Sequence, residues 1–245
     1  MCVNSRIMPA LPRRELPEFL DTPGQDPQEL WGLLQDIRRT NRRFGGGRLI
    51  LGYLQRFLPA LPGRPLQLLD VATASADIPC TIASWSRAAG VEIRITALDV
   101  NEDILAHAGR DAGRFPEIAL MRGDARALPF PDRSFDVVIC GLALHHFSFA
   151  DGVTVLREID RVAHGAFVVN DIVRSWAAYA GAWLDTRLLT RNRLSRHDGP
   201  VSVLRSFTAG ELREMAAAAG IRNVILDRHP VFRAALVRAP VGDRT

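Results

Sequence analysis

The chain has 245 residues, enough for one α/β domain with additions, and its 47% hydrophobic and 24% charged residues are ordinary for a globular protein. Its formal net charge is only +4, and all 31 basic residues are arginine. It contains no apolar run of about 18 residues and no apolar signal core at its N-terminus, so we expect a cytoplasmic protein without a membrane span.

The basic residues and the cysteines exclude several kinds of site. Many arginines lie in the first 50 residues, but no interleaved aromatic residues or known nucleic-acid motif accompany them. A solvated helix face is therefore favoured over a nucleic-acid surface. Cys2, Cys80 and Cys140 are widely spaced and form no C-x-x-C pair, so we predict neither a disulfide framework nor a metal site.

The first quarter of the chain is predicted to lie outside the main domain. Residues 1–25 are rich in proline and show little periodicity, which favours a loosely ordered arm. Helical patterns follow over 27–44 and 49–58, and they meet at three consecutive glycines. We expect residues 26–62 to form a helical cap that packs over a cleft or covers a sheet edge.

In the main domain, residues 63–245, short apolar strands alternate with amphipathic helices. Strands are predicted at 66–71, 91–98, 118–121, 135–140, 166–169, 221–227 and 231–237, and helices at 78–89, 102–113, 151–162 and 209–219. This order predicts a Rossmann-like, doubly wound α/β fold with a mostly parallel, seven-stranded sheet. Residues 174–206 interrupt the alternation after the fifth strand, and we expect them to form a helical lid over the substrate.

The predicted lid contains aromatic and acid–base candidates. Trp176, Tyr179 and Trp183 lie at i, i+3 and i+7, on one helical face, which fits core packing or an aromatic substrate wall. His197 and Asp198 are a possible acid–base pair, but the segment HDGP around them is also typical of a turn, and the turn is favoured.

Three acids follow successive predicted strands: Asp70, Asp99 and Asp124. The carboxyl ends of parallel strands meet at one edge of a sheet, so these side chains can converge on one ligand. Asp99 is placed to accept both ribose hydroxyls of a nucleoside, and Asp124 to accept from an adenine amino group. The alternative is that both acids cap the helices that follow them.

A turn of small residues joins the first strand to its helix. Its backbone N–H groups, together with the positive end of the helix dipole, are expected to face the same ligand. The turn residues concerned are Ala72, Thr73, Ala74 and Asp77.

Three stretches carry the most specific pattern: LLDVATASADIP, ITALDVN and RGDARALPFPDRSFDVVICGLALHHF. They resemble class I S-adenosylmethionine-dependent methyltransferases, in the branch related to quinone-biosynthesis C-methyltransferases, over about residues 64–170. By this resemblance Asp99 binds the ribose, Val100 packs on the adenine, and Asp124 with Ala125 reads the adenine edge. It also implies that Asp70 orients the turn and the ammonium group of the ligand, and that Leu142 contributes to the cofactor site.

The chain departs from this family at the glycine-rich turn, where G-x-G-x-G is replaced by Ala72-Thr73-Ala74-Ser75-Ala76. Glycine serves there because the backbone adopts positive φ and approaches the ligand closely. An alanine in the left-handed region costs on the order of 1 kcal/mol, so a shifted or weakened cofactor site is one reading of this turn.

His145 and His146 follow the fourth strand, at the mouth of the expected crevice. A general base that accepts the acceptor's proton belongs there, because methyl transfer otherwise needs little beyond in-line placement. Adjacent residues point in different directions, so we expect at most one histidine to face the substrate. His145 is preferred, against the alternative of a structural histidine.

The resemblance implies that the protein uses S-adenosylmethionine and releases S-adenosylhomocysteine. The similarity of residues 188–206 to a subgroup associated with phenolic or polyketide lipids favours O-methylation of a small phenolic or polyketide acceptor in secondary metabolism. Alternatives are C-methylation of a quinone-like substrate, or a protein that has lost methyl transfer and acts as a cyclase, isomerase or binding protein. A nicotinamide cofactor is disfavoured because G-x-G-x-x-G is absent. We expect a monomer or homodimer.

Overall fold

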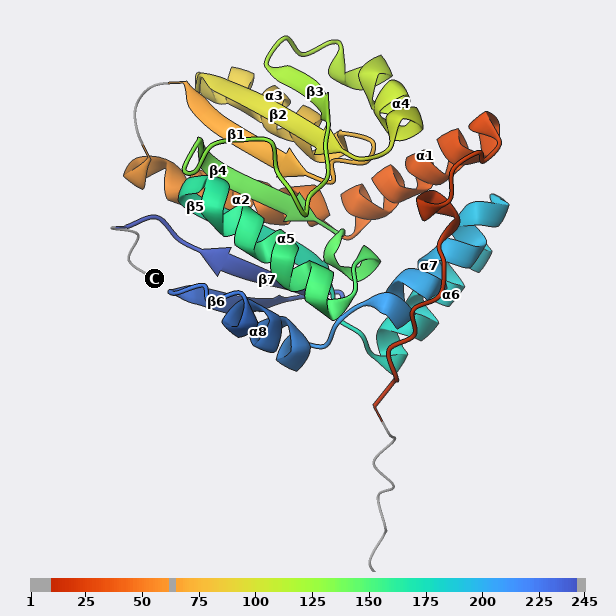
Figure 1. The fold of residues 1–245 in the computed structure, drawn as a ribbon. Coiled ribbons are helices and arrows are strands. Elements are labelled where there is room, and N and C mark those ends of the chain that lie inside the picture. Colours follow the sequence, from red (N-terminus) through yellow and green to blue (C-terminus); the bar gives the residue numbers. More distant parts are fainter. Residues whose placement is uncertain (1–9, 62–64, 242–245) are drawn as a thin grey trace, which may run out of the picture.

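The computed structural model describes residues 10–61 and 65–241, which form one α/β domain (Figure 1). The strands are β1 (Leu66–Val71), β2 (Ile93–Asp99), β3 (Ile118–Arg122), β4 (Phe135–Gly141), β5 (Ala163–Ile172), β6 (Val224–His229) and β7 (Arg233–Arg238). The helices are α1 (Pro27–Arg43), α2 (Gly46–Phe57), α3 (Asp77–Ala89), α4 (Glu102–Ala112), α5 (Phe149–Val162), α6 (Trp176–Leu189), α7 (Arg193–Arg205) and α8 (Ala209–Ala218). Short 3-10 turns η1 (Phe19–Asp21), η2 (Leu58–Ala60) and η3 (Leu144–His146) complete the described elements.

The seven strands form a single sheet in the order β3-β2-β1-β4-β5-β7-β6. The first five strands pair in parallel, and β7 is antiparallel to both β5 and β6. The first strand, β1, therefore lies in the middle of the sheet. Strands β2 and β3 extend the sheet on one side of it, and β4 to β7 extend it on the other. The predicted Rossmann-like, mostly parallel sheet is confirmed.

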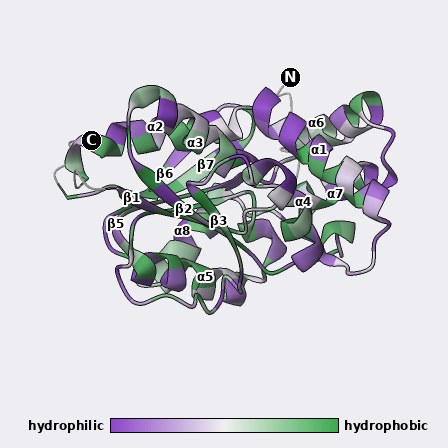
Figure 2. Cartoon of the chain, turned by 90° about the horizontal axis from the view of Figure 1, so that it is seen from above, coloured by the Kyte–Doolittle hydropathy of each residue, from purple (hydrophilic) through white to green (hydrophobic). Residues whose placement is uncertain are grey.

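Alternation along the strands produces two apolar layers, one on each face of the sheet. On β1, Leu66 and Leu68 pack with α2 and α3, whereas Leu69 and Val71 pack with α5 and α8. Figure 2 shows α2 and α3 on one side of the sheet and α5 on the other. Because both faces are covered, the ligand-binding groups are left at the carboxyl edge of the strands.

The polar stretch of the predicted lid is helical, and the turn expected at HDGP is wrong. Residues 193–205 form α7, with Asn192 as the N-cap and Pro200 inside the helix. Proline has no N–H to donate to the carbonyl four residues earlier, that of Arg196, and Nη1 of Arg187 on α6 donates to it instead, at 2.9 Å. Contacts from a distant segment thus let α7 continue through a sequence that is locally typical of a turn.

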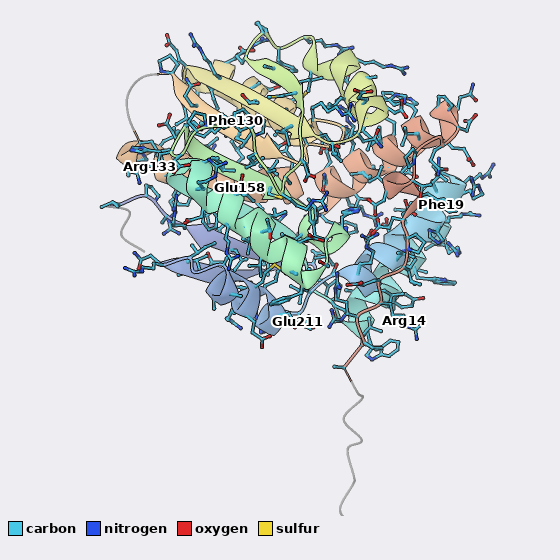
Figure 3. The ribbon with its side chains drawn as sticks, viewed as in Figure 1. Arg14, Phe19, Phe130, Arg133, Glu158 and Glu211 are labelled. Carbon is cyan, nitrogen blue, oxygen red and sulfur yellow. The ribbon has the colours of Figure 1, made fainter. Side chains whose placement is uncertain are left out.

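Residues 10–25 lie across α7 instead of forming the expected loose arm, whereas residues 1–9 lie outside the described part. The carboxylate of Asp198 accepts hydrogen bonds from the backbone N–H groups of Phe19 and Leu20, at 2.9 and 3.0 Å. The Phe19 ring packs on His197 of α7, with 4.6 Å between ring centroids. Figure 3 shows Phe19 on this segment, next to α7. We refer to residues 10–25 as the arm.

The two N-terminal helices have different positions. Helix α1 contacts α7, and α2 packs on the sheet. The expected boundary between cap and main domain, at residues 62 and 63, lies outside the described residues. No helix in the described ranges is long and apolar enough to cross a membrane.

Candidate active site

A cavity of about 650 Å³ opens at the carboxyl edge of β1, β2, β4 and β5. Helix α1 lines one wall, and α6 and α7 line another. Ten of the predicted site residues line it: Asp70, Ala72, Thr73, Ala74, Asp77, Asp99, Val100, Leu142, His145 and His146. The convergence of the strand-end acids Asp70 and Asp99 on one cavity agrees with the sequence prediction.

The turn after β1 keeps a glycine-like backbone although its residues are alanine. Ala72, Ala74 and Ala76 have φ of 56°, 47° and 53°, all in the left-handed region. Hydrogen bonds hold the turn: Thr73 N–H donates to the Leu98 carbonyl at 2.9 Å, and Ala74 N–H to Oδ2 of Asp99 at 3.0 Å. The alanines therefore carry conformational strain.

Two side chains of helix α1 form hydrogen bonds with this turn. Nη2 of Arg38 donates to the Ser75 carbonyl at 2.8 Å, and Nδ2 of Asn41 donates to Oδ2 of Asp77 at 3.1 Å. The turn is thus fixed by an element that precedes it in sequence by more than 30 residues.

Asp70 is buried at the base of the turn, and burial raises the pKa of its carboxyl to about 8. The hydrogen bond from Oγ1 of Thr73, at 2.7 Å, opposes this rise, while the nearby charges of Asp77 and Asp99 add to it. Burial thus favours the neutral form of this carboxyl, and a cationic ligand group beside it would favour its ionised form.

Asp99 is 7% exposed and ends β2. Burial raises the pKa of its carboxyl, and hydrogen bonds from the backbone N–H groups of Asn101, Ala74 and Val100 oppose that rise. The next side chain, Val100, is 60% exposed and lies on the cavity wall. A carboxylate beside an exposed apolar side chain suits a ligand that has hydroxyl donors next to a flat apolar ring.

Asp124 and Ala125 are not part of the cavity wall. The Asp124 carboxylate binds Nη2 of Arg126 at 2.7 Å, and this hydrogen bond lowers the pKa of Asp124. Ala125 is buried in the core beneath. From this segment it is Arg126 that lines the cavity.

His145 forms a buried pair with Asp171, a residue that the sequence analysis did not assign to the site. Nδ1 of His145 lies 2.7 Å from Oδ1 of Asp171, and the His145 N–H donates to Oδ2 at 2.9 Å. Burial tends to raise the pKa of Asp171, but the charge of His145 and these hydrogen bonds outweigh it and lower the pKa. Because Nδ1 is engaged, Nε2 is the nitrogen left to meet a ligand.

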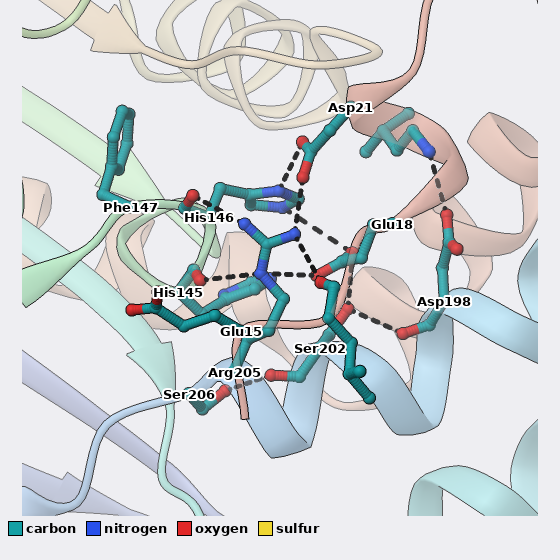
Figure 4. A network of polar contacts seen from close by, with 12 residues as sticks. Glu15, Glu18, Asp21, His145, His146, Phe147, Asp198, Ser202, Arg205 and Ser206 are labelled. Atoms are coloured by element: carbon teal, nitrogen blue, oxygen red, sulfur yellow. Dashed lines mark hydrogen bonds and ion pairs between the residues drawn. The ribbon is translucent and has the colours of Figure 1, made fainter. Parts of the chain in front are cut away.

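His146 belongs to a polar network that joins the arm, the loop after β4 and α7 (Figure 4). Its Nδ1 lies 2.7 Å from Oδ1 of Asp21, and its Nε2 lies 3.9 Å from Oε2 of Glu18. Burial tends to lower the pKa of His146, but the charges of Glu18 and Asp21 raise it overall. His146 thus has acidic partners of its own, distinct from those of His145.

Arg205 of α7 completes this network (Figure 4). Its guanidinium donates to the carbonyls of His145 and His146, at 3.1 and 2.6 Å, and to Oδ2 of Asp21 at 2.6 Å. Glu18, Asp21 and Arg205 were missed by sequence reasoning, because no local pattern distinguishes them from surface charges. Asp171 had a visible signal, since it stands at the end of a predicted strand.

One side-chain group has the composition of a metal site. Glu18, His145 and His146 place possible ligand atoms within 4.8 Å of one another. However, Nε of Arg205 lies 3.6 Å from Oε1 of Glu18, and Oγ of Ser202 donates to its other oxygen at 2.9 Å. A guanidinium already supplies positive charge there, so we interpret the group as an ion-pair network.

The predicted substrate-binding residues of the lid lie elsewhere. Trp176, Tyr179, Trp183 and His197 are not among the cavity-lining residues. Trp176 and Trp183 are 42% and 47% exposed, so the core interpretation is wrong for them as well. The cavity side of α6 consists instead of Ala178, Gly181, Ala182, Asp185 and Thr186, mostly small side chains that leave room for a ligand.

Residues 69–169 match the family model described as a methyltransferase domain. The ubiquinone/menaquinone biosynthesis C-methyltransferase UbiE of Rickettsia bellii is 28% identical over 137 residues, which cover 55% of this chain and 50% of that protein. The demethylmenaquinone methyltransferase of Bacillus licheniformis is 33% identical over 105 residues, 40% of this chain and 44% of that protein. The chain thus spans about half the length of the curated relatives that it matches.

Two solved structures show the same fold. Human N-acetylserotonin methyltransferase in complex with SAM has a TM-score of 0.62 at 14% identity, covering 88% of this chain and 57% of that chain. A SAM-dependent methyltransferase from Aquifex aeolicus has a TM-score of 0.59 at 15% identity, covering 89% and 100%. The resemblance to class I methyltransferases related to quinone-biosynthesis enzymes is confirmed.

Proposed function

We propose that this protein, whose residues 69–169 form a methyltransferase domain of the class I fold, is an S-adenosylmethionine-dependent methyltransferase that acts on a small-molecule acceptor. We favour transfer to a phenolic or polyketide hydroxyl. The observation that carries the proposal is the buried His145–Asp171 pair, of which His145 lines the same cavity as Asp70 and Asp99.

The cavity offers groups that match the cofactor. Asp99, with Val100 beside it, suits a ribose next to an adenine ring, and Asp70 suits an ammonium group. Asp124 and Ala125 would reach the adenine only after the Asp124–Arg126 pair had opened. When bound, the cofactor supplies an electrophilic methyl group and leaves as S-adenosylhomocysteine.

His145 is assigned the role of general base. Its Nε2 would accept the proton of the acceptor hydroxyl while the oxygen forms its bond to the methyl carbon. The imidazolium that results would be stabilised by Asp171, and a hydrogen bond to a charged partner contributes about 1.5–3 kcal/mol. Helices α6 and α7, on the cavity wall, would exclude water from the reacting groups.

A second candidate reaction is C-methylation, because the curated relatives include proteins named as C-methyltransferases. The same base would then remove a proton from an activated carbon of a quinol-like ring. Loss of methyl transfer is a third reading, motivated by the strained alanine turn.

The test is to incubate the purified protein with S-adenosylmethionine and a panel of phenols, hydroxylated polyketides and quinols, and to follow S-adenosylhomocysteine and methylated products. NMR of the product distinguishes an O-methyl from a C-methyl group. His145→Gln should abolish turnover without weakening S-adenosylhomocysteine binding, and His164→Gln, at an exposed site on β5, is the matched control. Failure of the wild type to bind S-adenosylhomocysteine would refute the proposed function.

A further inference from the structure

Arg233 is a buried cation in the wall of the cavity. It is the first residue of β7, it is 5% exposed, and it lines the cavity. Its Nη1 is buried and has no hydrogen-bond partner among the described residues. A buried donor of a charged group that lacks an acceptor destabilises a folded protein, so we expect a ligand to supply an acceptor for Nη1.

The two carboxylates that interact with the charge of Arg233 accept hydrogen bonds from other residues. The negative charges of Asp77 and Asp171 attract the positive charge of Arg233. Asp77 accepts from Nδ2 of Asn41 and Oγ of Ser75, each at 3.1 Å. Asp171 accepts two hydrogen bonds from His145. Both acids therefore offset part of the charge of Arg233, while its Nη1 stays without a hydrogen-bond partner among the described residues.

At the corner between α1 and α2, a hydrogen-bond acceptor on Asn41 lies close to Nη1 of Arg233. Oδ1 of Asn41 is buried and unpartnered. A Cβ at Gly46 would lie 2.9 Å from Nη1 of Arg233 and 3.0 Å from Oδ1 of Asn41. Glycine at this position leaves space for the two unpartnered groups side by side.

The β6–β7 turn that leads into Arg233 is itself strained. Val231 and Phe232 line the cavity with φ of 61° and 57°, and this conformation is a marked outlier for a β-branched residue such as Val231. The Phe232 carbonyl accepts the Val173 N–H at 2.7 Å, which fixes the turn against the end of β5. Backbone strain held in this way is typical of ligand-binding positions.

We propose that Arg233 binds a carboxylate of a ligand in this cavity, with Oδ1 of Asn41 accepting a hydrogen bond from the same ligand. The guanidinium fork matches a carboxylate in a bidentate geometry. The proposal rests on the proposed function, since it takes the ligands of the cavity to be the cofactor and the acceptor. The carboxylate belongs either to the amino-acid part of the cofactor or to an aromatic acid that serves as acceptor.

Binding titrations with two matched pairs of ligands test this proposal. S-adenosylhomocysteine and 5′-methylthioadenosine share the nucleoside, but only the first has a carboxylate. 2,4-Dihydroxybenzoate and resorcinol differ likewise. Arg233→Met should weaken the carboxylate-bearing member of one pair by about tenfold or more and leave its partner unchanged. Arg238→Met is the control, because Arg238 lies on the same strand, pairs with Asp160 and is not a cavity-lining residue.

The two pairs identify the source of the carboxylate. A loss confined to S-adenosylhomocysteine assigns it to the cofactor, and a loss confined to dihydroxybenzoate assigns it to the acceptor. Equal losses within each pair, or none, would overturn the proposal. If the wild type binds neither nucleoside, the proposed function fails, and the aromatic pair alone decides the role of Arg233. A wild type that binds none of the four ligands refutes both.

Two further readouts separate ligand binding from a structural role. Removing an unpartnered buried charge should raise the melting temperature of ligand-free Arg233→Met, whereas a structural arginine would lower it. Arg233→Lys keeps the charge but loses the fork, so its affinity for the carboxylate ligand should lie between those of the wild type and Arg233→Met.

Discussion

We predict that changing alanine to glycine stabilises the protein in the turn after β1 but destabilises it in a regular helix. Ala74 has a φ of 47°, and its side chain is half-buried on the cavity wall. Changing it to glycine removes a left-handed strain of about 1–2 kcal/mol. The greater freedom of glycine in the unfolded chain takes back about 0.4–1 kcal/mol. Ala74→Gly should therefore raise the free energy of unfolding by about 0.5–1 kcal/mol.

Two other alanines calibrate this expectation. Ala106 is exposed in the middle of α4, where alanine has the best helix propensity, so Ala106→Gly should cost about 1 kcal/mol. Ala76 shares the strain of the turn, but its methyl group is fully buried. Losing that burial costs about 0.8 kcal/mol, so Ala76→Gly should be nearly neutral.

Urea unfolding followed by circular dichroism measures the three variants against the wild type. The expected order of stability is Ala74→Gly, then Ala76→Gly, then Ala106→Gly. Titration with S-adenosylhomocysteine completes the test, because removing the Ala74 Cβ from the cavity wall should tighten binding. If Ala74→Gly is destabilised as much as Ala106→Gly, the turn is not strained and the reasoning fails.

Three further predictions concern buried acids. The pKa of Asp70 is about 8 in the folded protein against 3.8 for an ordinary aspartate, so stability should fall, by at most about 5 kcal/mol, as pH rises from 4 to 8. Asp70→Asn should flatten that profile in urea titrations, and an unchanged slope would show that another group is responsible. Asp171→Asn should lower kcat by about 100-fold or more while S-adenosylhomocysteine still binds, and unaltered turnover would remove His145 as the base. Asp198→Ala removes the acceptor of the Phe19 and Leu20 N–H groups, so hydrogen exchange at those two amides should accelerate, unlike that of the α5 amides.

The sheet and part of the site were predictable because their signals are local. An apolar run such as Leu66–Val71 identifies a buried strand without any knowledge of its neighbours. An acid at the end of such a strand, such as Asp70 or Asp99, must then lie at the carboxyl edge of the sheet. Topology brings these acids to one edge of the sheet, but it does not decide which of them line the cavity, because Asp124, which follows β3, pairs with Arg126 and is not a lining residue.

The lid and the arm were not predictable in the same way. Helix α7 shows no periodic apolar face and contains a proline. The carboxylate of its buried residue Asp198 accepts a hydrogen bond from a segment 178 residues away in sequence. The environment of Arg233 likewise depends on antiparallel pairing with β5 and on the corner at Gly46. Contacts over such separations leave no periodic trace in the chain.

The alanine turn shows how a family motif can be kept without its residues. The three positive φ values survive the loss of glycine. The clamps that oppose the strain come from Arg38 and Asn41 on α1, which lies outside the segment that matches the methyltransferase family model. Each hydrogen bond contributes about 1 kcal/mol, the same order as the strain of one alanine. We therefore predict that α1 helps this turn to accommodate alanine in place of glycine, although the helix lies outside the segment that matches the family model.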